Sequence, residues 1–433
     1  MGLGKSFGSF RRLTELTGFG SLKQGGMPIA LDFGVSGLKV LQVEAGDPPS
    51  LVAAAFIPTP DEYRGNAHAQ IDFQLDALPK VIRQGGFKGN RVACMIPASQ
   101  TFCKHMQLAK TDGLSIAQQA HAAVSGQLGC DPAALVLRHF EVGPVAGNPG
   151  KTEVICTAVP RPLVNRLLES TRKARLEMVG MHAEFSALLR CFDSITKRVE
   201  DDSLVSLYLD IGCASTKVLI AHGRSPVFAR CVDLGGRHMD EAVAQQLKCE
   251  LAEARERRAA VDTFETAAIT QPQERAVDAG LVALAGALRT EGGGSGLSMN
   301  LSQAAHEDRR EGAPPPGLST DVSAMPATTP APAGVDLREQ LEILTDEVQM
   351  SLRYHGSLFP GRRVDRTVFI GGESRQKGLC QQVAKALRLP AQIADPLSRV
   401  ARTGREPTTG IDLKETQPGW AGVLGLCLSP TDL

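Results

Sequence analysis

The stretch LYLDIGCASTKVL at residues 207–219 repeats the pattern of IALDFGVSGLKVL at residues 29–41. When Asp32 is aligned with Asp210, six of eleven neighbouring positions carry identical residues at a constant spacing of 178 positions. In each copy an apolar run ends in Asp-x-Gly, continues through small residues and returns as a second apolar run with a lysine near its start. This pattern predicts two β-hairpins that are related by an internal duplication.

Each hairpin has the residues of an anion-binding turn. Glycine and small side chains let backbone N–H groups approach phosphate oxygens, and Ser36, Ser215 and Thr216 can add hydroxyl donors. A carboxylate at the strand end, Asp32 or Asp210, is placed to bind Mg²⁺ directly or through water. A single Asp-x-Gly is commonly an ordinary hairpin turn, because both residues favour turns. Two matched copies instead favour a pair of loops that hold one nucleotide across a cleft.

A third glycine-rich turn lies near the end of the sequence, in VFIGGESRQKG at residues 368–378. The pattern indicates a strand that ends in Gly371 and Gly372 and is followed by a helix. Such a turn lets backbone approach the face of an adenine or a ribose where a side chain would clash. Two Asp-x-Gly hairpins followed by this turn, in that order, are more specific than any of the three motifs alone.

Composition excludes some classes of function. The chain has 433 residues, of which 42% are hydrophobic, so it is long enough for roughly two to four domains or subdomains. Lysine plus arginine and aspartate plus glutamate both number 47 and aromatic residues make up 4%, which argues against a nucleic-acid partner. Ten cysteines without zinc or CxxC spacing indicate buried, reduced thiols of a cytosolic protein. No apolar run reaches the roughly 18 residues of a membrane helix.

Strand-like apolar runs alternate with helix-length segments over most of residues 27–285, which indicates a mixed α/β protein. The runs in both hairpins are among the clearest strands. The spacing of apolar residues predicts helices at 115–128, 161–176, 184–198, 237–258, 337–352 and 375–388.

Two segments differ in composition from the rest. Residues 1–26 carry four basic residues and one acidic residue, and glycines interrupt their apolar residues. They predict a flexible tail and no signal peptide, with a short membrane-touching turn around Phe7, Phe10 and Leu13 as the alternative. Residues 290–335 are rich in Pro, Gly, Ser and Thr and predict a disordered insertion within the fold.

Together these motifs resemble the actin-like ATPase superfamily, with two phosphate loops and one adenosine loop. Within it, the sequence resembles the PilM family of type IV pilus assembly proteins, which is related to the division protein FtsA. The resemblance extends from about residue 27 to 427 without the 290–335 insertion. The stretches that carry it are LDFGVSGLKV, LDIGCASTKV, VFARCVDLGGRHMDEAVAQQL, HAEFSALLRCF and LTDEVQMSLRYHGSLFPGRRVDRTVFIGGESRQKG.

The resemblance implies an α/β protein with the actin-like ATPase fold, in which two duplicated RNase H-like lobes carry a small α+β subdomain inserted in the first. The implied division is residues 27–90 and 181–200 for the first lobe, 91–180 for the inserted subdomain, and 201–289 and 336–433 for the second lobe.

The resemblance also implies a binding site for ATP and Mg²⁺, with Asp32 and Asp210 as the metal ligands. Lys39 and Lys217 either reach phosphate or are ordinary outward-facing strand lysines. Glu184 stands where related enzymes keep a water-polarising residue, and a helix-capping or packing role is the alternative. The implied nucleotide-binding residues are Asp32, Gly34, Ser36, Gly37, Lys39, Asp210, Gly212, Ser215, Thr216, Lys217, Gly236, Gly371, Gly372 and Ser374.

Two positions depart from the family pattern. Gly37 stands where the family often has a hydroxyl residue, which removes one phosphate donor. Arg255 replaces an acidic residue in the helix that is expected to touch the ribose. Both departures put the affinity for a nucleotide in question.

By the same resemblance, we expect a cytoplasmic ATP-binding scaffold, peripheral to the inner face of the cytoplasmic membrane, with at most slow ATPase activity. It would bind the cytoplasmic N-terminal peptide of a PilN-like inner-membrane protein between the inserted subdomain and the first lobe. Other components of the pilus platform or motor are expected partners, the membrane contact is expected to be indirect, and an oligomer is compatible with the family.

Two other functions of the superfamily remain as alternatives. A sugar or acetate kinase needs a carboxylate to accept the hydroxyl proton, and Glu184 is the one candidate in the sequence pattern. An FtsA-like, filament-forming membrane adaptor would end in an amphipathic helix, and the closing GVLGLCLSPTDL is short for one. A related secretion machine could use the same ATP-binding module.

Overall fold

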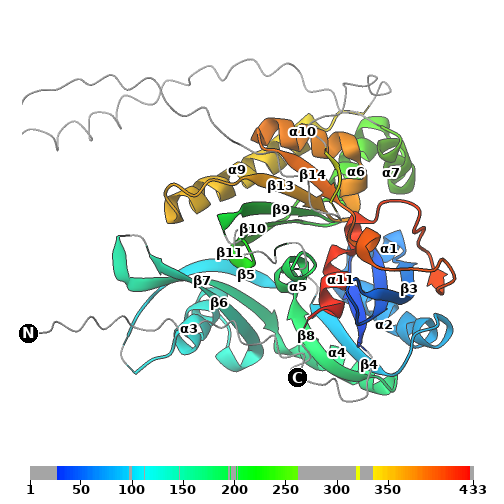
Figure 1. The fold of residues 1–433 in the computed structure, drawn as a ribbon, viewed down its shortest axis with the longest axis horizontal. Helices are drawn as coiled ribbons and strands as arrows, with labels where there is room; N and C mark the ends of the chain where they lie inside the picture. Colours follow the sequence, from blue (N-terminus) through cyan, green and yellow to red (C-terminus); the bar gives the residue numbers. More distant parts are fainter. Residues whose placement is uncertain are drawn as a thin grey trace, which may run out of the picture.

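The computed structural model describes residues 27–96, 100–111, 113–145, 147–193, 196, 201, 203–261, 318–321 and 335–429. The described chain forms two six-stranded sheets and one three-stranded sheet, and helices cover the outer faces of the two larger sheets (Figure 1). No helix among these residues is long and apolar enough to cross a membrane. The ten cysteines are free thiols, half of them buried.

The first lobe is built on a sheet with the order β15-β3-β2-β1-β4-β8. Strands β1, β2 and β3 form an antiparallel meander, and β4 and β8 then add in parallel beside β1. The strands are β1 (Ile29–Phe33), β2 (Gly37–Glu44), β3 (Ser50–Pro58), β4 (Arg91–Ile96), β8 (Glu177–Ala183) and β15 (Thr408–Thr409).

The second lobe has a sheet with the order β11-β10-β9-β13-β14-β12, whose first five strands repeat the order β3-β2-β1-β4-β8 of the first lobe. Its first three strands are again an antiparallel meander, and β13 and β14 again add in parallel beside the first strand. The repeated topology confirms the predicted duplication of the hairpins. The strands are β9 (Val205–Ile211), β10 (Thr216–His222), β11 (Ser225–Val232), β13 (Arg366–Ile370), β14 (Ala391–Ala394) and β12 (Leu318–Asp321).

Helices divide the core into three layers. The outer face of the first sheet packs against α2 and α4, and the outer face of the second sheet packs against α6, α7, α9 and α10. Helices α5 and α11 lie between the two sheets (Figure 1). The helices are α1 (Asp61–Arg64), α2 (Ala67–Gln84), α4 (Arg161–Lys173), α5 (Glu184–Arg190), α6 (Gly236–Leu247), α7 (Leu251–Ala259), α9 (Arg338–Leu358), α10 (Lys377–Leu387) and α11 (Ala421–Cys427).

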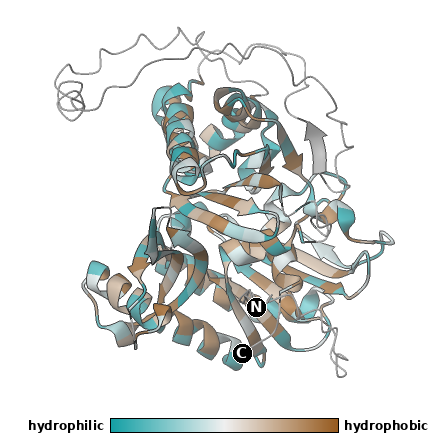
Figure 2. Ribbon diagram, turned by 60° about the vertical axis from the view of Figure 1, so that its left-hand side comes forward, coloured by the Kyte–Doolittle hydropathy of each residue, from teal (hydrophilic) through white to brown (hydrophobic). Residues whose placement is uncertain are grey.

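Side chains alternate between the two faces of β1 and of β9, the first strand of each lobe, and this alternation decides where Asp32 and Asp210 point. Leu31 and its alternate neighbours in β1 pack on the outer layer, as Leu209 and its alternate neighbours do in β9. Ala30 and Tyr208, one residue away, belong to the central core cluster. Because successive side chains of a strand point to opposite faces, the aspartates share the inner faces with Ala30 and Tyr208. Figure 2 shows hydrophobic residues along many of the strands.

A three-stranded sheet with the order β5-β7-β6 is inserted between β4 and α4. Its core cluster contains residues of α3 and of all three strands. The predicted boundaries of 91–180 are too wide for this sheet, because β4 and β8 pair within the first lobe and α4 packs on its outer face. The elements are β5 (Phe102–Ala109), α3 (Ile116–Leu128), β6 (Leu135–Val145) and β7 (Asn148–Pro160).

Two predicted helices are shorter than expected. The helix predicted at 184–198 ends at Arg190, where the N–H groups of Phe192 and Asp193 bond to carbonyls three residues back. The helix predicted at 237–258 is interrupted at Lys248, which has a φ of 51° and caps α6 in the left-handed conformation. Sequence gives little warning of this cap, because glycine or asparagine usually fills it.

Other differences concern segments that sequence reasoning passed over. The long helix α2 was not predicted, although Asn66 caps its first turn with a side-chain oxygen. Strand β12, whose backbone pairs with β14, lies inside the 290–335 segment that was predicted to be disordered. A bare edge of β14 offers unpaired backbone groups that such a strand can satisfy. The rest of that segment up to residue 334, and the predicted tail of residues 1–26, lie outside the described residues.

Candidate nucleotide-binding site

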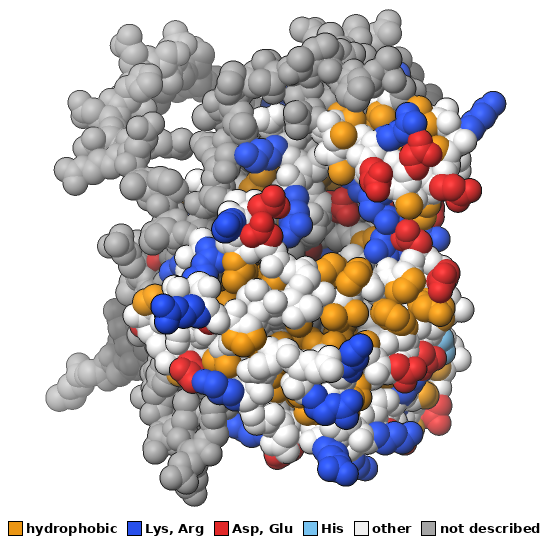
Figure 3. Space-filling model, turned by 90° about the vertical axis from the view of Figure 1, so that its right-hand side faces the viewer, with side chains coloured by type: hydrophobic (Ala, Val, Ile, Leu, Met, Phe, Trp, Pro, Cys, Tyr) orange, Lys and Arg blue, Asp and Glu red, His pale blue; other side chains and the backbone are white. Residues whose placement is uncertain are grey.

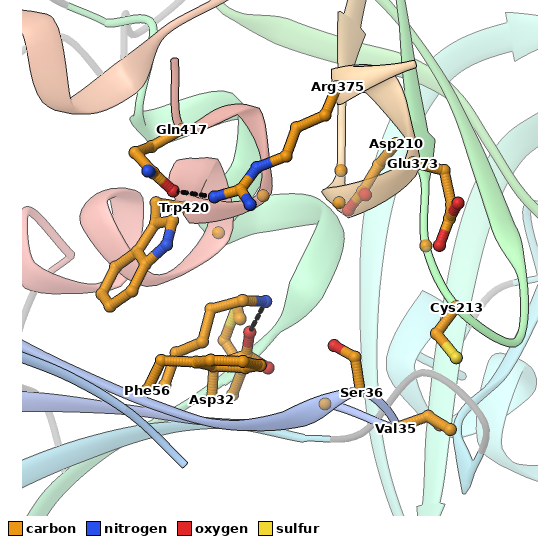
Figure 4. A pocket seen from close by; sticks show the side chains of 18 of the residues that line it. Asp32, Val35, Ser36, Phe56, Asp210, Cys213, Glu373, Arg375, Gln417 and Trp420 are labelled. Atoms are coloured by element: carbon orange, nitrogen blue, oxygen red, sulfur yellow. Dashed lines mark hydrogen bonds and ion pairs between the residues drawn. The ribbon is translucent and has the colours of Figure 1, made fainter. Parts of the chain in front are cut away.

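A cavity of about 340 Å³ lies between the two lobes and is lined by both hairpin turns (Figure 4). The turn after β13 and the chain from 410 to 422 complete its wall. The two halves of the sequence pattern, 178 residues apart, therefore meet at one site. The predicted residues that line the cavity are Asp32, Gly34, Ser36, Lys39, Glu184, Asp210, Gly212, Ser215, Lys217, Gly371 and Gly372.

Each hairpin sets an aspartate opposite a lysine. Asp32 pairs across the strands with Lys39, and Asp210 pairs with Lys217. The Lys39 Nζ lies 3.0 Å from the Asp32 Oδ2. Pairing in register therefore explains why the duplicated pattern keeps a lysine seven positions after its aspartate.

Lys217 has a second carboxylate partner. Its Nζ lies 3.0 Å from the Glu184 Oε1 and 3.7 Å from the Asp210 Oδ2. Burial alone would lower the pKa of Lys217, but the attraction of Asp210 and Glu184 outweighs it and raises the pKa above its ordinary value. Burial raises the pKa of Glu184, against the opposing pull of the Lys217 ammonium.

The position of Glu184 is compatible with the water-polarising role and argues against the capping role. It is the first residue of α5, but the helix has no side-chain cap, so the carboxylate does not cap it. The carboxylate lines the cavity and binds Lys217. It is therefore positioned to accept a proton or to orient a water molecule near a bound phosphate.

Buried groups fix the two phosphate-loop candidates in different ways. The side-chain amides of Gln70 and Gln74 in α2 donate to the Gly34 carbonyl at 3.0 and 2.7 Å. In the second lobe, backbone N–H groups at the start of α6 hold the loop, with Gly236 donating to the Gly212 carbonyl at 2.9 Å. Sequence reasoning missed both glutamines, because α2 itself was not predicted.

Four predicted nucleotide-binding residues do not line the cavity: Gly37, Thr216, Gly236 and Ser374. The Thr216 hydroxyl donates to the Leu234 carbonyl at 2.7 Å, and the buried Ser374 hydroxyl donates to the Ile370 carbonyl at 2.6 Å. Gly236 acts through the backbone N–H that holds the second loop. The Thr216 and Ser374 hydroxyls are therefore engaged with backbone carbonyls, and Gly236 holds the second loop through its N–H group.

Gly37 is a glycine for reasons of packing. A Cβ at this position would lie 2.5 Å from the Ile57 carbonyl oxygen and 2.5 Å from the Phe56 ring on β3. The missing hydroxyl noted in the sequence is therefore explained by the close approach of β2 to β3 at the turn. The corresponding Ser215 of the second lobe lines the cavity.

The turn after β13 requires glycine at its first position. Gly371 has a φ of 93°, and a Cβ there would collide with the Ile211 carbonyl and with the Asp210 carboxylate. Its N–H donates to the Pro418 carbonyl at 3.1 Å. The glycine therefore lets three chain segments meet beside Asp210.

Sequence reasoning missed the wall that the C-terminal region contributes. Figure 4 shows Arg375, Gln417 and Trp420 on one side of the cavity, and Arg375 donates to the Gln417 side chain. Gln417 and Trp420 are almost fully buried. The sequence around them has no helical or strand period, so only the Gly-Trp pair in PGWAG hinted at close packing.

Arg255, which departs from the family pattern, joins the two lobes at the rim. Its Nη2 and Nη1 donate to the Asp61 carboxylate of α1 at 2.8 and 3.2 Å, and its Nε donates to the Asp240 Oδ2 at 3.1 Å. The hydrogen bond from Arg255 lowers the pKa of Asp61. Asp240 also accepts from Arg258, which in turn binds Glu373 at the cavity wall. A series of ion pairs, in which acidic and basic residues alternate, thus extends along the rim from Asp61 to Glu373.

The donor set fits Mg²⁺ in the form that it takes with nucleotides. Among the described residues, no cluster of three or more His, Cys, Asp or Glu side chains could hold a metal unaided. Mg²⁺ is usually held by one or two carboxylates together with phosphate oxygens and water. Asp32 and Asp210, from facing strand ends that line one cavity, supply such a pair.

Two lobes of the same topology, closed around a cavity with paired Asp-x-Gly loops, define an actin-like ATPase fold. A family model for the type IV pilus assembly protein PilM matches residues 30–268, more than half of the sequence, so the chain belongs to the PilM family. A comparison with curated proteins found no significant match.

Among solved structures, one supports the same fold, and two others are less similar. A PilM-PilN type IV pilus biogenesis complex is similar with a TM-score of 0.63 and 20% identity, covering 93% of this chain and 98% of that one. The ethanolamine utilization protein EutJ from Carboxydothermus hydrogenoformans has a TM-score of 0.42, 11% identity, and coverage of 93% and 89%. MreB5 of Spiroplasma citri bound to ADP has a TM-score of 0.43, 11% identity, and coverage of 92% and 94%.

Proposed function

We propose that this protein is an ATP-binding scaffold of a type IV pilus assembly platform. The observation that carries the proposal is the single cavity lined by both Asp-x-Gly loops and by the Gly371–Gly372 turn. Membership of the PilM family supplies the biological setting. Nucleotide occupancy would act by favouring one arrangement of the two lobes, because a ligand shifts an equilibrium only through different affinity for its states.

ATP would lie with its phosphates between the two hairpin turns and its adenosine beside Gly371 and Gly372. Asp32 and Asp210 would hold Mg²⁺, which would screen the charge of the phosphates. Lys39 is already paired with Asp32 and could shift to a phosphate oxygen over a short distance. Arg375, at the opposite wall, offers a guanidinium plane to the adenine.

The surroundings of Glu184 favour slow turnover. A general base must be free to accept a proton, but the Glu184 carboxylate is held by the Lys217 ammonium at 3.0 Å. Burial raises the pKa of this carboxylate, but the carboxylate must leave its ion pair with Lys217 before it can accept a proton, so hydrolysis is expected to be slow at best. The same feature disfavours a sugar or acetate kinase, which would rely on this carboxylate.

A PilN-like membrane protein would bind through its cytoplasmic N-terminal peptide where the inserted sheet joins the first lobe. Among the described residues, β6 pairs on one side with β7 and its other edge can accept an added strand. Arg161 of α4 donates to the Ala133 and Leu135 carbonyls and so fixes the start of β6 against the first lobe. Such a partner would hold the protein on the cytoplasmic side of the inner membrane.

Calorimetric titration of the full chain with ATP tests the nucleotide site. The double variant Asp32→Asn with Asp210→Asn should lose Mg²⁺-dependent ATP binding while its thermal unfolding stays cooperative. Asp76→Asn, an exposed carboxylate on α2, is the matched control and should bind ATP as the wild type does. Unchanged ATP binding by the double variant would refute the site.

The partner is tested separately by fluorescence anisotropy. A labelled peptide from the cytoplasmic N-terminus of the PilN-like protein of the same organism should bind the full chain, and a scrambled peptide should not. Equal binding of the two peptides would contradict the proposed partner while leaving the nucleotide site untouched.

A further inference from the structure

The parallel strands of the first lobe begin at one side of the sheet and finish at the other. These two sides, here called edges, differ in chemistry. Asp32 lies near the end of β1 beside the cavity, and β8 leads into Glu184 at the same edge. β4 and β8 run parallel to β1, so all three begin at the opposite edge. Helices α2 and α4, which precede β4 and β8, end there as well. The edge far from the cavity is therefore formed by two helix ends and three strand starts.

Basic residues gather at this far edge, which we name the basic edge. Its cations come from the last turns of α2 and α4 and from the loops that lead into β4 and β8. The acidic residues that face the same edge are fewer, and Glu44 among them is paired with Lys88 at 3.4 Å. The cations are Lys80, Arg83, Lys88, Arg91, Arg172, Lys173 and Arg175, and the acids are Glu44, Asp47, Glu169 and Glu177.

The cations of the basic edge are open to solvent. All except the half-buried Arg91 are exposed. Figure 3 shows Lys and Arg side chains along the lower margin of that view, with few acidic side chains among them. The helix ends already offer partial negative charge to nearby cations, which helps to hold these side chains at the edge.

The first described residue, Met27, also lies at this edge. The Met27 carbonyl accepts a hydrogen bond from the Gln42 side chain at 3.1 Å, and the same amide nitrogen donates to the Lys88 carbonyl at 2.8 Å. Gln42 thereby fixes the first described residue beside a member of the basic edge. The preceding 26 residues contain four basic residues and one acidic residue, so the excess of positive charge continues into the sequence that joins here.

We propose that the basic edge docks directly on the anionic phospholipid headgroups of a membrane. Several exposed cations along one edge match a charged lipid surface, because anionic headgroups attract each lysine or arginine that comes close to them. Helix α4 connects the edge with the proposed partner site: Arg161 at its start fixes β6, and its last turn, roughly 18 Å away, lies in the basic edge. In this respect the inference rests on the proposed function.

The two contacts would reinforce each other. A peptide from a membrane-anchored protein confines the chain near the bilayer, and a second, weak contact then forms at high effective concentration. The basic edge would set the orientation, with the cavity facing away from the lipid. The proposal differs from the expectation of a purely indirect membrane contact, because it adds a direct electrostatic one.

Vesicle co-sedimentation of the full chain, without any partner, tests the proposal. Vesicles containing phosphatidylglycerol should bind the protein in low salt and release it in high salt, and vesicles of phosphatidylcholine alone should not bind it. The triple variant Arg83→Gln, Arg172→Gln and Lys173→Gln should partition at least about tenfold more weakly. The control variant Arg353→Gln, Lys377→Gln and Lys385→Gln removes three exposed cations from α9 and α10 and should partition like the wild type.

Several outcomes would overturn the proposal. They are unchanged vesicle binding by the triple variant, an equal loss in the control variant, and binding to duplex DNA that matches or exceeds binding to the vesicles. Thermal unfolding of both variants, with midpoints close to that of the wild type, excludes a trivial loss of fold. The triple variant should keep wild-type ATP and peptide affinities, so failure of the membrane contact and failure of the proposed function are distinguishable.

Discussion

Lys39 and Lys217 occupy equivalent positions in the two lobes, each opposite an aspartate in the neighbouring strand. Lys39 pairs with Asp32 at the cavity wall, whereas Lys217 lies between Asp210 and Glu184. The difference comes from α5, which begins beside the second hairpin and belongs to the connection between the lobes. The duplication thus repeats the strands, and the helix between the lobes makes their charges unequal.

The far ends of the same hairpins differ as well. Glu44 ends β2 and is exposed at the basic edge. The equivalent position at the end of β10 is His222, which is buried and lies with its Nε2 2.9 Å from the Nε2 of His355 in α9. One hairpin therefore ends in solvent and the other under a helix, because α9 covers the second lobe there.

Replacing the two lysines should give the largest difference between the lobes. Lys217→Met leaves two buried carboxylates without their cation and should lower the free energy of unfolding by about 3–5 kcal/mol. Lys39→Met, at a more open pair, should cost about 1 kcal/mol or less. Urea unfolding at neutral pH measures both.

A second substitution serves as the control for Lys217→Met. Adding Glu184→Gln removes one of the stranded charges and should recover a large part of the lost stability. Equal losses for the two single lysine variants would show that the lobes are electrostatically alike after all.

Exchanging Gly37 and Ser215, the equivalent residues of the two hairpin turns, should give the next largest effect on stability. Gly37→Ser places a Cβ against Ile57 and Phe56 and should lower the free energy of unfolding by about 1–3 kcal/mol. The reverse exchange, Ser215→Gly, adds freedom to the unfolded chain and should cost about 0.5–1 kcal/mol. Thermal unfolding of the two variants, scored against the wild type, measures the asymmetry. A stabilising Gly37→Ser would mean that β2 and β3 separate more easily than the packing indicates.

The first loop depends on side chains that the second loop does not need. Gln74→Leu removes the amide that donates to the Gly34 carbonyl and to the Thr59 hydroxyl, at 2.7 and 2.8 Å. Because Gln70 still donates to the same carbonyl, we expect a loss of about 1–2 kcal/mol. ATP affinity should fall along with stability, since the first loop loses its support. Gln84→Leu, at the exposed end of the same helix, is the control; an intact ATP affinity in Gln74→Leu would show that the loop holds its own shape.

The buried histidine pair should give the smallest effect, and one that depends on pH. Burial, with a further contribution from Arg362, lowers the pKa of His222 to about 4, and burial also lowers the pKa of His355. Their contribution to stability is complete above about pH 6.5, the unfolded pKa, and is lost as the pH falls toward 4. We expect a loss of about 1 kcal/mol between pH 7 and pH 5, measured from urea midpoints.

Replacing the two histidines by residues that cannot be protonated isolates their part of the pH-dependent loss of stability. His222→Gln with His355→Gln keeps hydrogen-bonding groups at both positions but cannot be protonated, so its stability should change less between the two pH values. The same slope in the variant and the wild type would assign the acid sensitivity to other groups.

The hairpins show how much of the site could be predicted from sequence. Asp32 and Asp210 could be paired because identical spacing in two copies is visible without coordinates, and strand alternation then places both on inner faces. Gln74 and Gln417 could not be found, because each contributes through a fold-dependent contact with a distant segment. Ser374 and Thr216 have the right chemistry at the right spacing, yet their hydroxyls are directed to backbone carbonyls.

The sequence by itself determined the repeated strands, the glycine turns and the family, since these depend on neighbours along the chain and on a period of two or on fixed spacing. Tertiary structure decided which lysine is buried, where the helices end and which cations share an edge. Those properties arise from contacts between segments far apart in sequence, such as Glu184 with Lys217 and Arg255 with Asp61. Burial and charge balance act through space, so they become definite only when the lobes are packed.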